Sequence, residues 1–185
     1  IKAATEKLTT VFYSISEKLY SQTAGAKAGA DVNGANAGEA EGPKTDENGN
    51  KTTGYDTDAI YKAVKNFTDS YNSLIDEVGN SNTKSILRAG ASMVNVTEAN
   101  RKSLSDIGIS IGADNKLTID EEKFKKTDMS KVKAMFADSS YYGTEVKRQA
   151  GRAESYAKSE AAKANTYQKS GSYTYNYRTG ELYNS

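Results

Sequence analysis

The 185-residue chain contains no cysteine, no histidine, no tryptophan and only one proline. The absence of cysteine and histidine excludes thiolate zinc sites, imidazole ligands, Ser–His and Cys–His nucleophile pairs, and disulfides. Only carboxylate, lysine or tyrosine chemistry remains, and the lysines and glutamates fall mainly where exposed helix faces are expected. We therefore predict that the chain is not an enzyme and has no catalytic residue, metal site or cofactor.

An excess of charge of one sign is also lacking. The 25 basic and 24 acidic side chains leave a net charge of +1, which provides no basic field for nucleic acid. No apolar run reaches 18 residues, so we expect no membrane insertion. Residues 1–6 show no basic stretch followed by an apolar one, so no cleavable signal peptide is expected. A cysteine-free chain is compatible with the cytoplasm or with export.

Apolar residues make up only 36% of the chain, so part of it is expected to lie outside any core. The composition changes near Tyr55 and again after Lys169. We predict an N-terminal amphipathic helix (1–22), a Gly/Ala-rich disordered linker (23–54), a helical domain (55–169) and a Tyr-rich tail (170–185).

The first segment has one apolar helical face. Its apolar residues are spaced by three or four, and Phe12 and Tyr20 widen the stripe, which comprises Ala4, Leu8, Val11, Ile15 and Leu19. Such a face requires a partner to cover it.

The following linker is poor in residues that build a core. Residues 24–54 include seven Gly and seven Ala, and Val32 is their only large aliphatic residue. Too little apolar surface is available to offset the entropy of ordering. Residues 46–50 resemble part of a calcium loop, but the glycine is misplaced and Thr57 stands where a glutamate should close the loop.

The helical domain begins with a regular heptad seam. Asp56 and Asp58 are candidate N-caps, and the seam runs to the helix end at Gly79 through Ile60, Val64, Phe67, Tyr71, Leu74 and Val78. Residues 82–103 predict a second helix with a weak point near Gly90.

The apolar period then changes from the helical value to two. Alternating isoleucines in 107–111, a turn at 112–115 and alternation through 119 predict a β-hairpin over 107–119. Its isoleucine face must rest on the helices, because an isolated hairpin is marginal. Asp120 and Asp128 are each expected to cap a short helix.

The last helix, about 144–169, has a seam made almost entirely of alanine: Val146, Ala150, Ala153, Ala157, Ala161 and Ala164. Small residues allow close approach of another helix, either the 60–78 seam or a counterpart on another chain. In the tail, Tyr173, Tyr175 and Tyr177 alternate, as in an edge strand or adhesive strip, although chain ends usually fray.

The predicted fold is therefore mainly α: a helical bundle or coiled-coil hairpin with one small β-hairpin, plus an isolated N-terminal helix and a disordered linker. The two seams, from Ile60 to Val78 and from Val146 to Ala164, are the candidate interaction residues.

Several sequence segments, in order, resemble one family. FTDSYNSLI (67–75), LSDIGIS (104–110), KLTIDEEKF (116–124) and VKAMF (132–136) are similar to the C-terminal region of hook-associated protein 2, the flagellar filament cap. The resemblance covers about residues 56–140.

This resemblance implies a secreted, oligomeric, non-enzymatic protein at the filament tip that helps flagellin subunits assemble and supports motility. The implied partners are other copies of the chain and flagellin-like subunits, with host-surface contact through the Tyr-rich tail. The implied location is extracellular, on the bacterial flagellum.

The first segment resembles a different family. IKAATEKL (1–8), ISEKLY (15–20) and the Gly/Ala stretch after them look like the C-terminal lid helix and tail of a DnaK-type heat-shock chaperone. The alternative is thus a chaperone-derived fragment or fusion in the cytoplasm, without ATPase activity.

Overall fold

The computed structural model describes residues 1–21 and 55–164. Its helices are α1 (Lys2–Ser21), α2 (Thr57–Gly79), α3 (Lys84–Ala99), α4 (Arg101–Asp106), α5 (Glu121–Lys125), α6 (Met129–Phe136) and α7 (Tyr141–Ala164). Strands β1 (Ile109–Ile111) and β2 (Leu117–Ile119) pair antiparallel, with Ser110 opposite Thr118. The predicted fold class, mainly helical with one small hairpin, is confirmed. The predicted linker, 23–54, and the tail, 170–185, lie outside the described residues.

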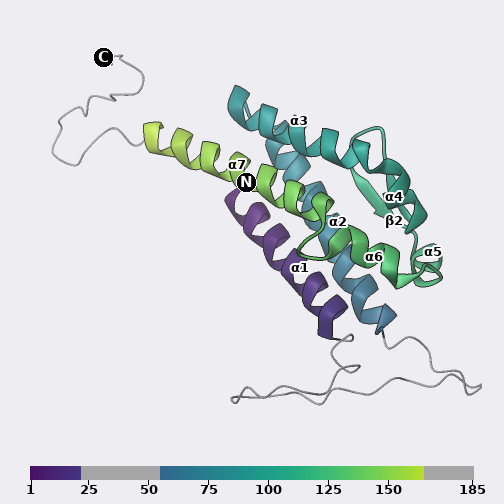
Figure 1. Ribbon diagram of the computed structural model, residues 1–185. Coiled ribbons are helices and arrows are strands. Elements are labelled where there is room, and N and C mark those ends of the chain that lie inside the picture. Colours follow the sequence, from purple (N-terminus) through teal and green to yellow (C-terminus); the bar gives the residue numbers. More distant parts are fainter. Residues whose placement is uncertain (22–54, 165–185) are drawn as a thin grey trace, which may run out of the picture.

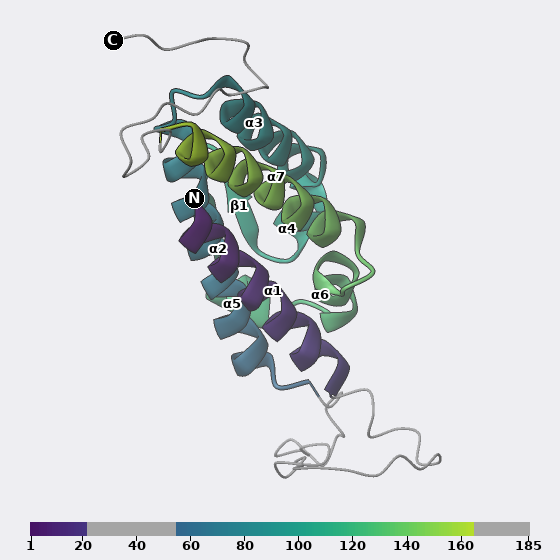
Figure 2. The same cartoon turned by 90° about the vertical axis from the view of Figure 1, so that its left-hand side faces the viewer.

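Helix α2 is the element around which the others pack (Figures 1 and 2). Helix α1 runs along it, the hairpin and α5 contact it elsewhere, and α7 lies between α1 and α3. The α2 seam is buried along its whole length, because α1 and the hairpin remove its apolar side chains from water. Among the described residues, no helix is long and apolar enough to cross a membrane.

Helix α1 differs from its predicted isolated state, because it is part of the core. Leu8, Phe12, Ile15 and Leu19 have no exposed surface, and they belong to the same apolar cluster as the α2 seam. The physical reason is the burial of apolar surface. Helices α1 and α2 each carry an apolar face, and packing them together removes both faces from water. Tyr20 departs from the predicted stripe, since 44% of it is exposed.

Helix starts follow the predicted caps. The carboxylates of Asp56, Asp120 and Asp128 accept hydrogen bonds from the amides of Ala59, Lys123 and Ser130 at 2.8–2.9 Å. Helix α7 begins at Tyr141, earlier than predicted, because the Ser140 hydroxyl accepts from the Gly143 amide at 3.2 Å. These bonds satisfy amides that the helices leave unpaired.

The helix is unbroken at Gly90, the predicted weak point. Helix α3 runs through Gly90, where a Cβ would lie 2.3 Å from the Val78 Cγ1. The missing side chain therefore lets α3 approach the end of α2, and this packing offsets the low helix propensity of glycine.

We predict that Gly143→Ala destabilises the protein by about 1–3 kcal/mol through overpacking. A Cβ at position 143 would lie 1.7 Å from the Cζ of the buried Phe12 ring. Gly151→Ala, on the same helix, is the matched control, since a Cβ there meets nothing within 4 Å. That control should gain up to about 1 kcal/mol from helix propensity. Urea denaturation measures both, and equal effects would show that α1 does not occupy this position.

Candidate interaction site

The predicted interaction residues of α2 lie inside the chain's own core. All six seam residues, from Ile60 to Val78, are buried. In α7 the seam is buried at Val146, Ala150 and Ala153, partly buried at Ala157 and exposed at Ala161. The side chain of Ala164 lies outside the described residues. Both seams therefore pack inside a single chain. They do not pack against each other, because α7 packs on α1 and α3.

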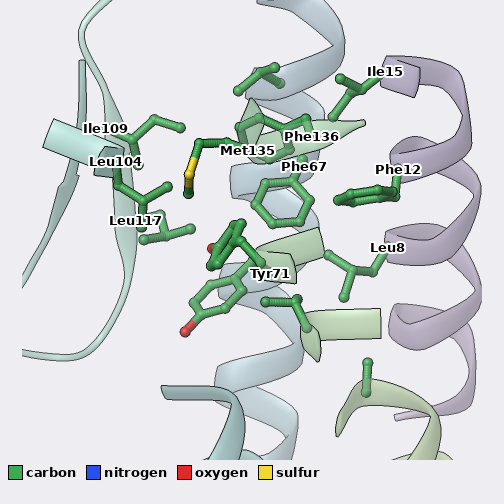
Figure 3. Packing of buried hydrophobic residues seen from close by; sticks show 14 of the residues in the cluster. Leu8, Phe12, Ile15, Phe67, Tyr71, Leu104, Ile109, Leu117, Met135 and Phe136 are labelled. Atoms are coloured by element: carbon green, nitrogen blue, oxygen red, sulfur yellow. The ribbon is translucent and has the colours of Figure 1, made fainter. Parts of the chain in front are cut away.

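The aromatic side chains of four elements meet at Phe67 of α2 (Figure 3). The Phe67 ring centroid lies 5.1 Å from that of Phe136 in an edge-to-face arrangement, and 6.2 Å from those of Phe12 and Tyr142. Edge-to-face pairs are favourable because the positive ring edge meets a negative face. These contacts join α1, α2, α6 and α7 at one point.

Two phenols are buried beside this cluster. The hydroxyls of Tyr71 and Tyr142 form no hydrogen bond to a described residue. Burial raises the pKa of Tyr71 to about 12, and it raises the pKa of Tyr142 further above its usual range. The nearby Thr97 hydroxyl, which donates to the Met93 carbonyl at 3.0 Å, lowers both pKa values, but by less than burial raises them. Both phenols are therefore held neutral.

One polar side chain fixes the hairpin to α2. The Asn72 amide nitrogen donates to the Leu117 carbonyl at 2.8 Å, and the Leu117 amide donates to the Asn72 side-chain oxygen at 2.7 Å. Asn72 thus acts like a neighbouring strand for the backbone of β2. The heptad pattern pointed only to the apolar residues around Asn72 and did not reveal this role.

An open hollow lies where α4, α5 and α6 meet, lined by acidic and basic side chains. Two of its acids are engaged in the fold: Asp120 and Asp128 cap helices, and the Ser130 amide holds the pKa of Asp128 below its usual value. Across residues 1–21 and 55–164, no three acidic side chains are grouped as a metal site would require. We assign the hollow a structural role.

The exposed aromatic residues were not predicted as interaction residues. Tyr13, Tyr20 and Tyr141 are 56%, 44% and 70% exposed. The Lys147 ammonium of α7 lies 4.7 Å from the Tyr13 ring centroid, and the Lys133 ammonium of α6 lies 4.6 Å from that of Tyr20. Tyr13 and Tyr20 lie seven residues apart and therefore on one side of α1, and we call these two tyrosines the tyrosine face.

The tyrosine face offers amphipathic rings with lysine ammonium groups beside them. Tyrosine is common in protein interfaces because its ring buries much area while its hydroxyl keeps a polar partner. The sequence signal was the placement of Tyr13 and Tyr20 seven residues apart, just beside the apolar stripe. This arrangement is suited to protein contact rather than to chemistry.

Comparison with known proteins gives one family. The family described as flagellar hook-associated protein 2 C-terminus matches residues 80–184, more than half of the chain. No curated protein and no solved structure matches the chain. Residues 1–79 lie outside the matched range, so the resemblance of residues 1–50 to a DnaK-type chaperone stays a prediction.

We predict that Asn72→Ala costs about 2 kcal/mol or more, because it leaves the amide and carbonyl of Leu117 without their partners. Ser73→Ala is the neighbouring control, since the Ser73 hydroxyl only donates to the Asp69 carbonyl on an exposed helix face. Urea denaturation gives the free energies, and hydrogen exchange at Leu117 should accelerate only in the Asn72 variant. Unchanged exchange there would contradict the role of Asn72.

The buried phenol predicts a loss of stability in alkali. Well below pH 10, the Tyr71 phenol is protonated in the folded and in the unfolded protein. Above pH 10 the phenol of the unfolded protein loses its proton first, because burial raises the pKa of Tyr71 in the folded protein to about 12. The free energy of unfolding should therefore fall as the pH rises from 10 to 12.

Tyr71→Phe should make that fall shallower, while Tyr141→Phe, at an exposed phenol, should leave the wild-type curve unchanged. Denaturation midpoints at several pH values measure the effect. Identical curves for Tyr71→Phe and wild type would contradict the burial of this hydroxyl.

Proposed function

The chain belongs to the flagellar hook-associated protein 2 C-terminal family, and on that premise we propose that it is a non-enzymatic subunit of the flagellar filament cap. In this role it associates with other copies of itself and contacts flagellin-like subunits during filament assembly. Its place is outside the cell, at the filament tip.

The family match is the observation that carries this proposal. Residues 80–184 include α3 to α7 and the hairpin, and therefore most of the described fold. The resemblance to the cap family extends upstream to the segment FTDSYNSLI (67–75). This segment contains Phe67 and Asn72. Phe67 is the centre of the aromatic cluster and Asn72 holds the hairpin, so these residues support the matched region directly.

The surface chemistry supports assembly. Several acid–base pairs between described residues are exposed or half-exposed ion pairs within one helix, such as Lys65 with Asp69 at 3.0 Å. Such pairs are worth little and leave the surface well hydrated. The tyrosine face is different, because large rings there remain in water, where a partner can cover them.

We propose the tyrosine face as the contact with a second protein chain. The exposed end of the α7 seam, at Ala161, is a further contact in this proposal, since a small side chain lets a neighbouring helix come close. The buried part of both seams then builds the rigid body that carries these contacts. Host-surface contact through residues 170–185 is part of the proposal on sequence grounds alone.

The test is sedimentation velocity of the purified chain over a range of concentrations, with and without purified flagellin. The proposal predicts self-association that strengthens with concentration, and a slower boundary for the chain alone than with flagellin. A strict monomer that does not bind flagellin would contradict it.

Substitution of the tyrosine face sharpens this test. Tyr13→Ser combined with Tyr20→Ser should weaken association about tenfold or more, as expected from losing about 1.4 kcal/mol of contact. Tyr156→Ser is the matched control, because Tyr156 is also exposed but lies outside the tyrosine face. An equal effect of the control would place the contact elsewhere on the chain.

A further inference from the structure

Helix α1 occupies a groove formed by the rest of the chain. Phe12 enters this groove deepest: its ring contacts those of Phe67 and Phe136, at centroid distances of 6.2 and 6.0 Å. The groove fits this side chain closely, since a Cβ added at Gly143 would lie only 1.7 Å from the Cζ of the Phe12 ring. Leu8, Ile15 and Leu19 complete the buried stripe.

Polar contacts hold α1 along the side of the groove formed by residues 138–150, which include the start of α7. The amide of Asp138 donates to the Ser16 hydroxyl at 3.2 Å, and the Thr5 hydroxyl donates to the Ala150 carbonyl at 3.4 Å. The Lys147 ammonium lies 4.5 Å from the Phe12 ring centroid and forms an ion pair with Asp138 at 3.7 Å. These contacts specify the position and direction of α1, so the groove is matched to this helix rather than to any apolar segment.

The chain connection to α1 is far longer than the geometry requires. Helix α1 ends and α2 begins at the same end of the bundle (Figures 1 and 2). Antiparallel neighbouring helices are usually joined by about 2–8 residues. Here residues 22–54, 33 in number, separate them. A connection of this length can span up to about 110 Å when extended. Covalent attachment therefore does not restrict α1 to the groove of its own chain.

We propose that α1 is an exchangeable helix: the groove between α2, α6 and α7 binds the α1 of a second copy of this chain. Each half of such a dimer keeps every contact described above, so exchange loses no packing. This proposal goes beyond the cap function and holds whether or not the chain assembles on flagellin. In the exchanged dimer, the apolar face of α1 from one chain packs against the apolar face of α2 from the other chain.

Concentration decides between the closed and exchanged forms. The groove meets its own α1 at an effective concentration on the order of 1 mM or below for a tether of this length. Exchange should therefore be small in dilute protein and should increase as the protein concentration approaches that value. Dense arrays of neighbouring subunits favour it for the same reason.

The absence of cysteine permits a direct test in the full-length chain. Two variants each carry one cysteine, Tyr13→Cys on α1 or Lys147→Cys on α7, at positions whose side chains meet across the groove edge. Both are unfolded, mixed, refolded at about 1 mM and treated with a short bismaleimide. Exchange predicts a Tyr13–Lys147 crosslink between different chains after joint refolding but not after mixing of the two folded variants, whereas a surface contact through Tyr13 would crosslink both mixtures.

The matched control pairs Lys147→Cys with Lys7→Cys, an exposed position rotated about 120° from Tyr13 around α1. Exchange predicts a crosslinked dimer of twice the 20.0 kDa chain mass in the first mixture, well above the control, and increasing with concentration. A chain carrying both Tyr13→Cys and Lys147→Cys, refolded when dilute, should crosslink within one molecule.

Two further results would overturn the proposal. In the first, the double variant crosslinks internally while the mixed single variants give no more dimer than the control, so α1 stays with its own chain. In the second, the double variant gives no internal crosslink, so α1 does not occupy the groove at all.

Discussion

The fold depends on one contact between distant parts of the chain, the insertion of Phe12 into the groove closed by Phe67, Phe136 and Gly143. Helix α2 carries apolar side chains toward α1 and also toward the hairpin, so neither partner alone can cover it. Packing α1 there removes a full heptad stripe from water on both helices, which is the main source of stability for helices of this kind. Without α1, Phe67 and Phe136 would lose their aromatic neighbour and face solvent.

Periodicity predicted the elements well because each helix and strand has one consistent apolar face. The α2 seam, the hairpin and the caps at Asp56, Asp120 and Asp128 all followed from local rules that the tertiary structure does not override. Helix–helix partners could not be predicted in the same way. An apolar stripe indicates that a helix packs against a partner, but it does not identify the partner. For this reason α1 was predicted to be an isolated helix, whereas it is part of the core of the domain.

The remaining differences arise where two elements approach more closely than average. Gly90 looks like a weak point in the sequence and Gly143 lies just before the predicted last helix, yet each marks a place where a neighbour's side chain takes the position of a Cβ. Asn72 looks like an ordinary polar residue of a helix, and only the position of β2 gives its amide a function. The tyrosine face was missed because exposure depends on the final packing. The resemblance to the flagellar cap family, by contrast, could be recognised from short sequence segments that follow one another in the family's order. Residues of these segments hold the core and the hairpin together.

The packing of α1 makes it and residues 55–164 one cooperative unit. Native-state hydrogen exchange of the full chain tests it directly, because it gives an opening free energy for each amide. We expect the amides around Phe12 in α1 to open with the same free energy as those around Phe67 in α2, and both to equal the global free energy of unfolding. Exchange in α1 that is orders of magnitude faster, with α2 still protected, would contradict it.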